Sequence, residues 1–270
     1  MKKAFCALVL ALTVPAALFA YDNSPSAYQV FPECVWAPAT GGGTWIPEVQ
    51  ITNHVPTGST IPIYAYYFYG TGYRFAILTT SIPSYSTFEY TNILATLQAI
   101  DSKFTYYGTS GCLMLCTLDV SLVFSAVIRI SNGNYGKTFP GLAWVDSSTA
   151  NVARDMKIPI IMQSSSYRTF TGFWNGIWTG GSMTVRFFVV DASGNLIGNH
   201  WDETFAEHQF KVFNPFAKAG LTGTYTNHWL FISPQTSASS GPNSRGLFGF
   251  GSLANNVTND TYALIATQWQ

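Results

Sequence analysis

The chain has 270 residues, of which 13 are Lys or Arg and 13 are Asp or Glu, so its formal net charge is zero. Only 10% of its residues are charged and no basic block occurs, which argues against electrostatic binding of nucleic acid. Aromatic residues make up 16% of the chain, so rings, hydroxyls and amides dominate its chemistry.

The first twenty residues have the pattern of a secretory signal peptide. Lys2 and Lys3 precede an apolar run, and small residues lead to Ala20, where we expect cleavage. The run is too short to cross a bilayer, which takes about 20 apolar residues. No later segment is long and apolar enough either. The sequence therefore predicts a secreted protein (extracellular, cell-surface or periplasmic) with no transmembrane segment in the mature chain.

The remaining chain contains the same pattern twice. A shift of about 122 positions places Ile63–Phe68 on Val185–Val190 and Asn92 on Asn214. A repeat of this length indicates two copies of one globular unit rather than a solenoid. We expect one domain at residues 21–146, a polar linker at 147–156 and a second domain at 157–270.

Both copies carry short β-branched and aromatic runs between clusters of Gly, Pro, Asn and Asp, as β-sandwiches do. The fold class expected is all-β, with two tandem antiparallel β-sandwich (jelly-roll or Ig-like) domains. The predicted strands are Val30–Ala37, Trp45–Asn53, Ile61–Tyr69, Phe75–Ile82, Ser86–Asn92, Gly111–Leu118, Leu122–Ser131, Leu142–Asp146, Lys157–Gln163, Thr169–Trp178, Met183–Asp191, Leu196–Asp202, His208–Asn214, His228–Ser233, Arg245–Ser252 and Tyr262–Gln268.

Helix and turn signals are few. Asn92 is placed to cap a short helix within Tyr90–Ile100, and Asn214 precedes a proline at a first-turn position. Asp191–Asn195 carries the Ser-Gly-Asn signal of a hairpin. One short helix or turn per repeat is expected.

Three cysteines follow the signal peptide: Cys34, Cys112 and Cys116. In an oxidising compartment they predict one disulfide and one thiol. Residues four apart on a strand lie about 13 Å apart, so Cys112 and Cys116 cannot bond each other. Cys34 is then the expected partner of one of them. No histidine or fourth cysteine completes a metal site, so no metal or cofactor is expected.

Three features carry a resemblance: an early apolar strand ending at Asn or Gly (Gln50–Asn53 and Phe173–Gly176), a strand with a Gly-bearing hairpin (Val189–Asn195), and an alternating strand (Ala126–Ser131). This arrangement resembles the tandem β-sandwich proteins that many bacteria secrete. The resemblance implies an extracytoplasmic, non-catalytic protein.

No catalytic set is apparent. None of the four histidines lies beside a nucleophile elbow, and Gly-x-Ser-x-Gly is absent, so an enzyme is not expected. The densest polar cluster, His200–Glu203 followed by Glu207 and His208, is interpreted as a solvated hairpin end rather than a cation site.

Two functions remain open. Few charges, two like domains and many aromatic residues favour a structural subunit of a cell-surface or extracellular assembly, built by self-association or with other surface proteins. The alternative is a carbohydrate-binding (lectin-like) adhesion module, with the loop aromatics Tyr69, Tyr73 and Trp201 as candidate ligand-binding residues. Most other rings are expected in cores. The further aromatic residues considered for such a role are Trp36, Trp45, Tyr66, Tyr67, Trp174, Trp178 and Trp229.

Overall fold

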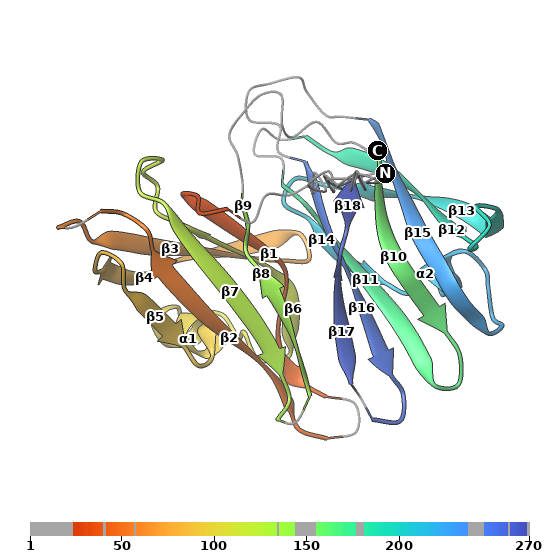
Figure 1. Cartoon of the computed structure of the whole chain (residues 1–270), viewed down its shortest axis with the longest axis horizontal. Helices are drawn as coiled ribbons and strands as arrows, with labels where there is room; N and C mark the ends of the chain where they lie inside the picture. The colour runs from red at the N-terminus through yellow and green to blue at the C-terminus, as the bar shows by residue number, and fades with distance from the viewer. Residues whose placement is uncertain are drawn as a thin grey trace, which may run out of the picture.

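The computed structural model describes residues 24–39, 42–56, 58–133, 135–143, 155–176, 181–236, 246–258 and 260–268. Within these ranges the chain is all-β, with antiparallel ladders and two short helices (Figure 1). None of the described helices is long and apolar enough to cross a membrane. The predicted signal peptide and most of the predicted linker lie outside the described residues.

The first half contains nine strands and one helix: β1 (Tyr28–Pro38), β2 (Thr44–Asn53), β3 (Ile61–Tyr69), β4 (Gly72–Ile82), β5 (Thr87–Tyr90), α1 (Ile93–Ile100), β6 (Thr109–Cys116), β7 (Phe124–Ser131), β8 (Gly136–Pro140) and β9 (Leu142–Ala143). The second half contains β10 (Met156–Gln163), β11 (Tyr167–Asn175), β12 (Met183–Val190), β13 (Leu196–Phe205), β14 (Phe210–Phe213), α2 (Pro215–Lys218), β15 (Tyr225–Thr236), β16 (Leu247–Asn255), β17 (Thr261–Ile265) and β18 (Thr267–Gln268).

The first half forms a nine-stranded sheet in the order β4-β3-β6-β1-β2-β7-β8, with β5 on β2 and β9 on β1. The β1–β2 ladder consists of only two pairs, Ala37 with Trp45 and Pro38 with Thr44. It divides the sheet into a β3 wing (β4-β3-β6-β1-β9) and a β7 wing (β5-β2-β7-β8). These two names are kept below.

The second half repeats this order strand for strand. Its five-stranded sheet, β13-β12-β15-β10-β18, corresponds to the β3 wing, and we call it the β12 sheet. Its four-stranded sheet, β14-β11-β16-β17, corresponds to the β7 wing, and we call it the β16 sheet. β3 begins at Ile61 and β12 at Met183, about 122 positions apart, as the sequence pattern predicts.

The predicted local signals are present in both repeats. The side chain of Asn92 accepts from the Ala95 amide at 3.0 Å and caps α1. Asn214 accepts from the Phe216 amide at 2.9 Å and caps α2, whose first residue is Pro215. These caps satisfy amides that an open helix end leaves unpaired.

The two halves share one hydrophobic cluster, which the sequence does not predict. Trp174, Phe210, Phe248 and Phe250 of the β16 sheet belong to the cluster formed by the core of the first half. Figure 1 shows β16 and β17 lying next to the first half. A β-carbon at Gly172 would lie 2.0 Å from the Phe250 ring, so only glycine leaves room for that ring.

The corresponding face of the first half is more polar, with Val127 in the position that Phe250 occupies in the second half. On the β7 wing, Glu48 forms an ion pair with Arg129 at 3.3 Å. The hydroxyl groups of Thr52 and Thr87 are hydrogen-bonded at 2.9 Å. In the ladder of the second half, the position of this threonine pair is taken by Trp174 and Phe210. The β16 sheet of the second half packs on the first half through aromatic side chains. The equivalent face of the β7 wing is solvated, so it could not make the same aromatic contact with another copy.

The cysteine prediction needs correction. Cys34, Cys112 and Cys116 are free thiols, and all three are buried. Cys34 lies opposite Gly111 in the β1–β6 ladder, and Cys112 lies opposite the irregular pair Pro32 and Glu33, so no two cysteines face each other across a ladder. Burial raises the pKa of the Cys34 and Cys112 thiols well above the usual range.

Candidate functional site

The strand β4 stands at the end of the nine-stranded sheet and exposes large apolar side chains. Tyr73, Phe75 and Ile77 are 49%, 43% and 50% exposed. Alternate residues of a strand point to the same face, so these three side chains form one row. An exposed hydrophobic row at a sheet edge is a feature that monomeric proteins usually avoid.

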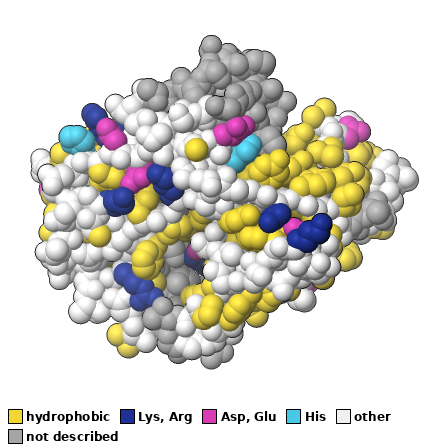
Figure 2. Space-filling view, turned by 180° about the vertical axis from the view of Figure 1, so that it is seen from behind, with side chains coloured by type: hydrophobic (Ala, Val, Ile, Leu, Met, Phe, Trp, Pro, Cys, Tyr) yellow, Lys and Arg dark blue, Asp and Glu magenta, His cyan; other side chains and the backbone are white. Residues whose placement is uncertain are grey.

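Rings of the neighbouring strand β3 extend this row into a surface. The Phe75 ring lies 4.8 Å from that of Tyr66 and is stacked on that of Tyr64 at 5.9 Å. We call Tyr64, Tyr66, Tyr73, Phe75 and Ile77 the aromatic surface. Figure 2 shows hydrophobic side chains gathered in a patch on the half of the molecule formed by β1–β9. A tyrosine phenol is neutral at neutral pH, and burial raises the pKa of Tyr66 further.

The one charged residue of β4, Arg74, is held by contacts with the segment that follows α1. Its guanidinium lies 3.9 Å from the Asp101 carboxylate and 4.9 Å from the centre of the Phe104 ring. Arg74 alternates with Tyr73 and Phe75, so its side chain leaves the opposite face of the strand. The aromatic surface itself thus carries no charged side chain.

The corresponding edge strand of the second half, β13, is charged. Asp202 binds Arg186 through two hydrogen bonds of 2.8 and 2.9 Å, which lower the pKa of this carboxyl group. Its neighbour Glu203 lies 2.9 Å from Lys211 and 2.6 Å from Lys218. Charges on an edge strand disfavour pairing with another strand. The equivalent edge strands of the two repeats therefore differ: β4 exposes apolar side chains, whereas β13 carries charged ones.

The three predicted ligand-binding residues do not share a site. Tyr69 packs on Phe104 at 4.3 Å, whereas Tyr73 belongs to the aromatic surface. Trp201 is stacked on Phe187 at 5.3 Å and lies against the core of the second half. Trp201 therefore behaves as a packing residue, because its strand position turns the indole toward Phe187.

The polar cluster around residue 200 is dispersed in the same way. His200 packs against Phe188, at 5.8 Å between rings, while Glu207 lies 3.5 Å from His208 near the junction of the halves. Among the described residues, no three His, Cys, Asp or Glu side chains come together in a way that could hold a metal ion.

A pocket of about 530 Å³ opens on the β12 sheet, at a place where none of the predicted ligand-binding residues lies. Its lining residues are Lys157, Pro159, Ile160, Ala192, Ser193, Gly194, Asn227, His228 and Trp229. Two signals in the sequence point to it: the hairpin at Asp191–Asn195, and Trp229, one of the aromatic residues considered for a flat binding face.

Comparison with protein-family models and with curated proteins finds no match to this chain.

Proposed function

We propose that this protein is a secreted, non-catalytic building block of a cell-surface or extracellular assembly, made of two β-sandwich repeats. In this proposal a copy associates with a second copy through the aromatic surface on β3 and β4. The observation that carries the proposal is the exposed apolar row of Tyr73, Phe75 and Ile77 on an edge strand.

Physical chemistry favours such a contact. An edge strand offers backbone N–H and C=O groups along one side, and these groups can pair with another strand. Apolar side chains beside the edge add the gain from removing their surface from water. Aromatic residues are also enriched in the centres of protein contacts.

A second copy of the chain is the partner that best fits this edge. Two β4 strands can pair antiparallel about a twofold axis, which brings the same row of side chains together from both sides. The chain has a formal net charge of zero, so little long-range repulsion opposes the encounter. Larger assemblies would need a second contact on each copy. We suggest the outer face of the β7 wing for it, because this face is equivalent to the face of the β16 sheet that joins the two halves.

The proposal is tested with the mature chain purified from residue 21. Light scattering over rising concentration should show a shift from monomer to dimer or larger species, and negative-stain microscopy should show particles of matching size. A strictly monomeric mass at every concentration, with no ordered particles in the images, would overturn the proposal.

A further inference from the structure

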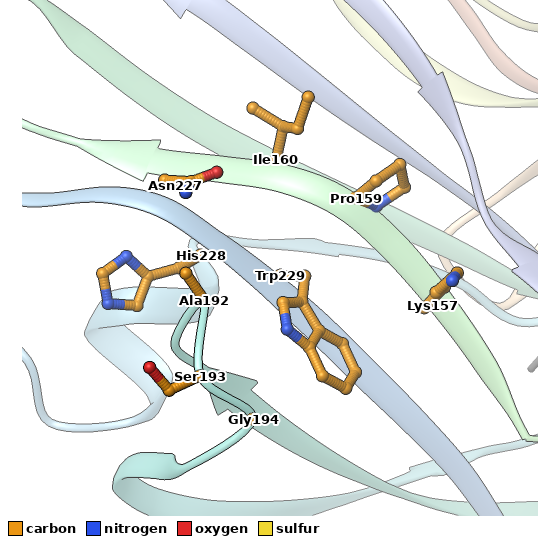
Figure 3. A pocket seen from close by; sticks show the side chains of 9 residues that line it. All are labelled: Lys157, Pro159, Ile160, Ala192, Ser193, Gly194, Asn227, His228 and Trp229. Atoms are coloured by element: carbon orange, nitrogen blue, oxygen red, sulfur yellow. The ribbon is translucent and has the colours of Figure 1, made fainter.

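His228 and Trp229 line the pocket from the interior of the β12 sheet. Their strand, β15, pairs with β10 on one side and with β12 on the other, whereas β18 pairs with β10 only at Met156 and Lys157. A ligand there cannot extend the sheet by adding a strand, as peptides do at open edges. It has to be recognised by side chains. Figure 3 shows the side chains of Trp229 and His228 next to the loop that carries Ser193.

A bulge in β10 creates the pocket. Ile158 is opposite Leu230 and Ile161 is opposite His228, so Pro159 and Ile160 together face the single residue Trp229. Ile160 has φ of 58° and is 46% exposed. A β-branched residue with positive φ is a strained exception, and such strain concentrates at functional sites. Bulges are also common beside binding sites, where they redirect side chains.

The first half contains an equivalent bulge in β1, where it is buried. Pro32 and Glu33 of β1 face the single residue Cys112, just as Pro159 and Ile160 face Trp229. There the bulge is buried, because Glu33 bonds Lys137, which in turn bonds Ser252 of the β16 sheet. The same place on the scaffold thus contacts protein in the first half and is open in the second.

Trp229 is held in a fixed orientation. Its Nε1–H donates to the backbone oxygen of Asp191 at 3.1 Å, so the ring offers its face rather than its polar edge. The Asp191 carboxylate accepts from the Ser193 and Asn195 amides at 2.9 and 2.8 Å, which fixes the loop and lowers the pKa of Asp191. A ring fixed before binding loses little entropy when a ligand arrives.

Polar groups of several kinds surround this ring. Ser193 supplies a hydroxyl and Asn227 an amide. Nδ1 of His228 lies 2.6 Å from the Thr226 carbonyl oxygen, which can only accept, so Nδ1 carries a proton and a ligand hydroxyl would bond Nε2 instead. The Asp191 carboxylate at the base of the loop lies close enough to His228 for an electrostatic interaction, and a carboxylate there disfavours a negatively charged ligand.

We propose that this pocket binds a neutral pyranose sugar of a glycan, with the apolar face of the sugar on Trp229. A pyranose combines a face of C–H groups with a rim of hydroxyls that both donate and accept. The pocket combines a fixed aromatic face with a hydroxyl, an amide, an imidazole and an ammonium group. This inference does not depend on the proposed self-association, because Trp229 and the aromatic surface lie on different repeats.

The test uses the mature chain and a panel of neutral oligosaccharides: cellohexaose, maltohexaose, xylohexaose and chitohexaose, with polygalacturonate fragments as the acidic comparison. Calorimetry should detect binding of at least one neutral member. Trp229→Ala should weaken that binding about tenfold, since the main contact face is lost. Ala192→Arg, which places a long side chain in the exposed loop, should weaken it to a similar extent without changing the melting temperature.

Two control variants separate this site from the rest of the surface. Tyr73→Ala alters the aromatic surface, and Tyr262→Ala removes an exposed ring elsewhere; both should leave sugar binding unchanged. The inference is overturned if no neutral member binds, if the acidic fragments bind in preference, or if binding survives both Trp229→Ala and Ala192→Arg. Self-association is measured separately, by light scattering, so a failure of sugar binding does not count against self-association, and a failure of self-association does not count against sugar binding.

Discussion

Lys137 and Glu33 form a buried ion pair at the junction of the two halves. The Lys137 ammonium lies 2.6 Å from both carboxylate oxygens of Glu33 and 2.7 Å from the Ser252 hydroxyl. Glu33 and Lys137 come from β1 and β8, while Ser252 comes from β16 of the other half. Burial raises the pKa of Glu33 more than the nearby ammonium lowers it. The pair therefore costs desolvation energy, and its bond to Ser252 links the two halves.

Lys137→Met should destabilise the protein by about 3–5 kcal/mol, because it leaves the Glu33 carboxylate buried without a counter-charge. The double variant Glu33→Gln/Lys137→Met should recover most of this loss, since neither buried charge remains. Urea unfolding of the wild type, both single variants and the double variant gives the coupling energy. Additive effects of the two single changes would show that the pair is not coupled.

Acid should weaken the junction through His208. Its ring lies 5.3 Å from Phe68 and 5.7 Å from Tyr73, and burial lowers its pKa below the usual 6.5, with Glu207 acting in the opposite direction. A lowered folded-state pKa means that stability is fully present above 6.5 and is lost as the pH falls through the folded value. His208→Asn keeps a residue type that tolerates the φ of 57° and removes the titration.

The measurement is the free energy of unfolding in urea, followed from about pH 7.5 down to about pH 5. The wild type should lose stability relative to His208→Asn as the pH falls. A difference between the two proteins that does not change with pH would contradict the role given to His208.

The two repeats use a buried asparagine at the same position. Nδ2 of Asn53 donates to the Ile82 carbonyl at 2.9 Å, and Nδ2 of Asn175 donates to the Phe205 and Ala206 carbonyls at 3.2 and 3.0 Å. Asn53→Ala and Asn175→Ala should each cost about 1–3 kcal/mol, because buried carbonyl groups lose their donors. Gln50→Ala, at an exposed position of the same strand β2, should cost less than about 0.5 kcal/mol in the same urea titration. Equal costs for all three changes would contradict this explanation.

The thiols of the mature chain should be unreactive in the folded protein. Cys34, Cys112 and Cys116 are buried, and burial raises the pKa of Cys34 and Cys112, so little thiolate is present at neutral pH. Titration with Ellman's reagent should show all three thiols only after unfolding in guanidinium chloride. Recovery of a single thiol from the unfolded, unreduced protein would show that a disulfide forms after all.

Local patterns in the sequence predict much of this fold. The offset between Asn92 and Asn214 identifies equivalent helix caps, because a cap depends on a few neighbouring residues. The ring placements are harder to predict. Trp201 and Trp229 both stand in strands of alternating character, yet the partner strands turn Trp201 toward Phe187 and leave Trp229 at a bulge. Such outcomes depend on pairing between strands that are distant along the chain.

Two further features depend on long-range contacts in the same way. β8 is only five residues long and was not predicted as a strand, because its side chains gain their burial from β7 and from the second half. The equivalence of the two bulges becomes visible only when the register of each ladder is known, since Pro32 and Pro159 alone mark no particular turn.

The central claim is self-association through the aromatic surface, and matched charge insertions on the two edge strands test it most directly. Phe75→Lys places a cation in the middle of the apolar row on β4, and Leu196→Lys does so at a residue of β13 that is 48% exposed. Sedimentation velocity should show the wild type and Leu196→Lys associating with rising concentration, while Phe75→Lys stays monomeric and keeps the far-UV circular dichroism of the folded protein. Association of Phe75→Lys at the wild-type level would contradict the account.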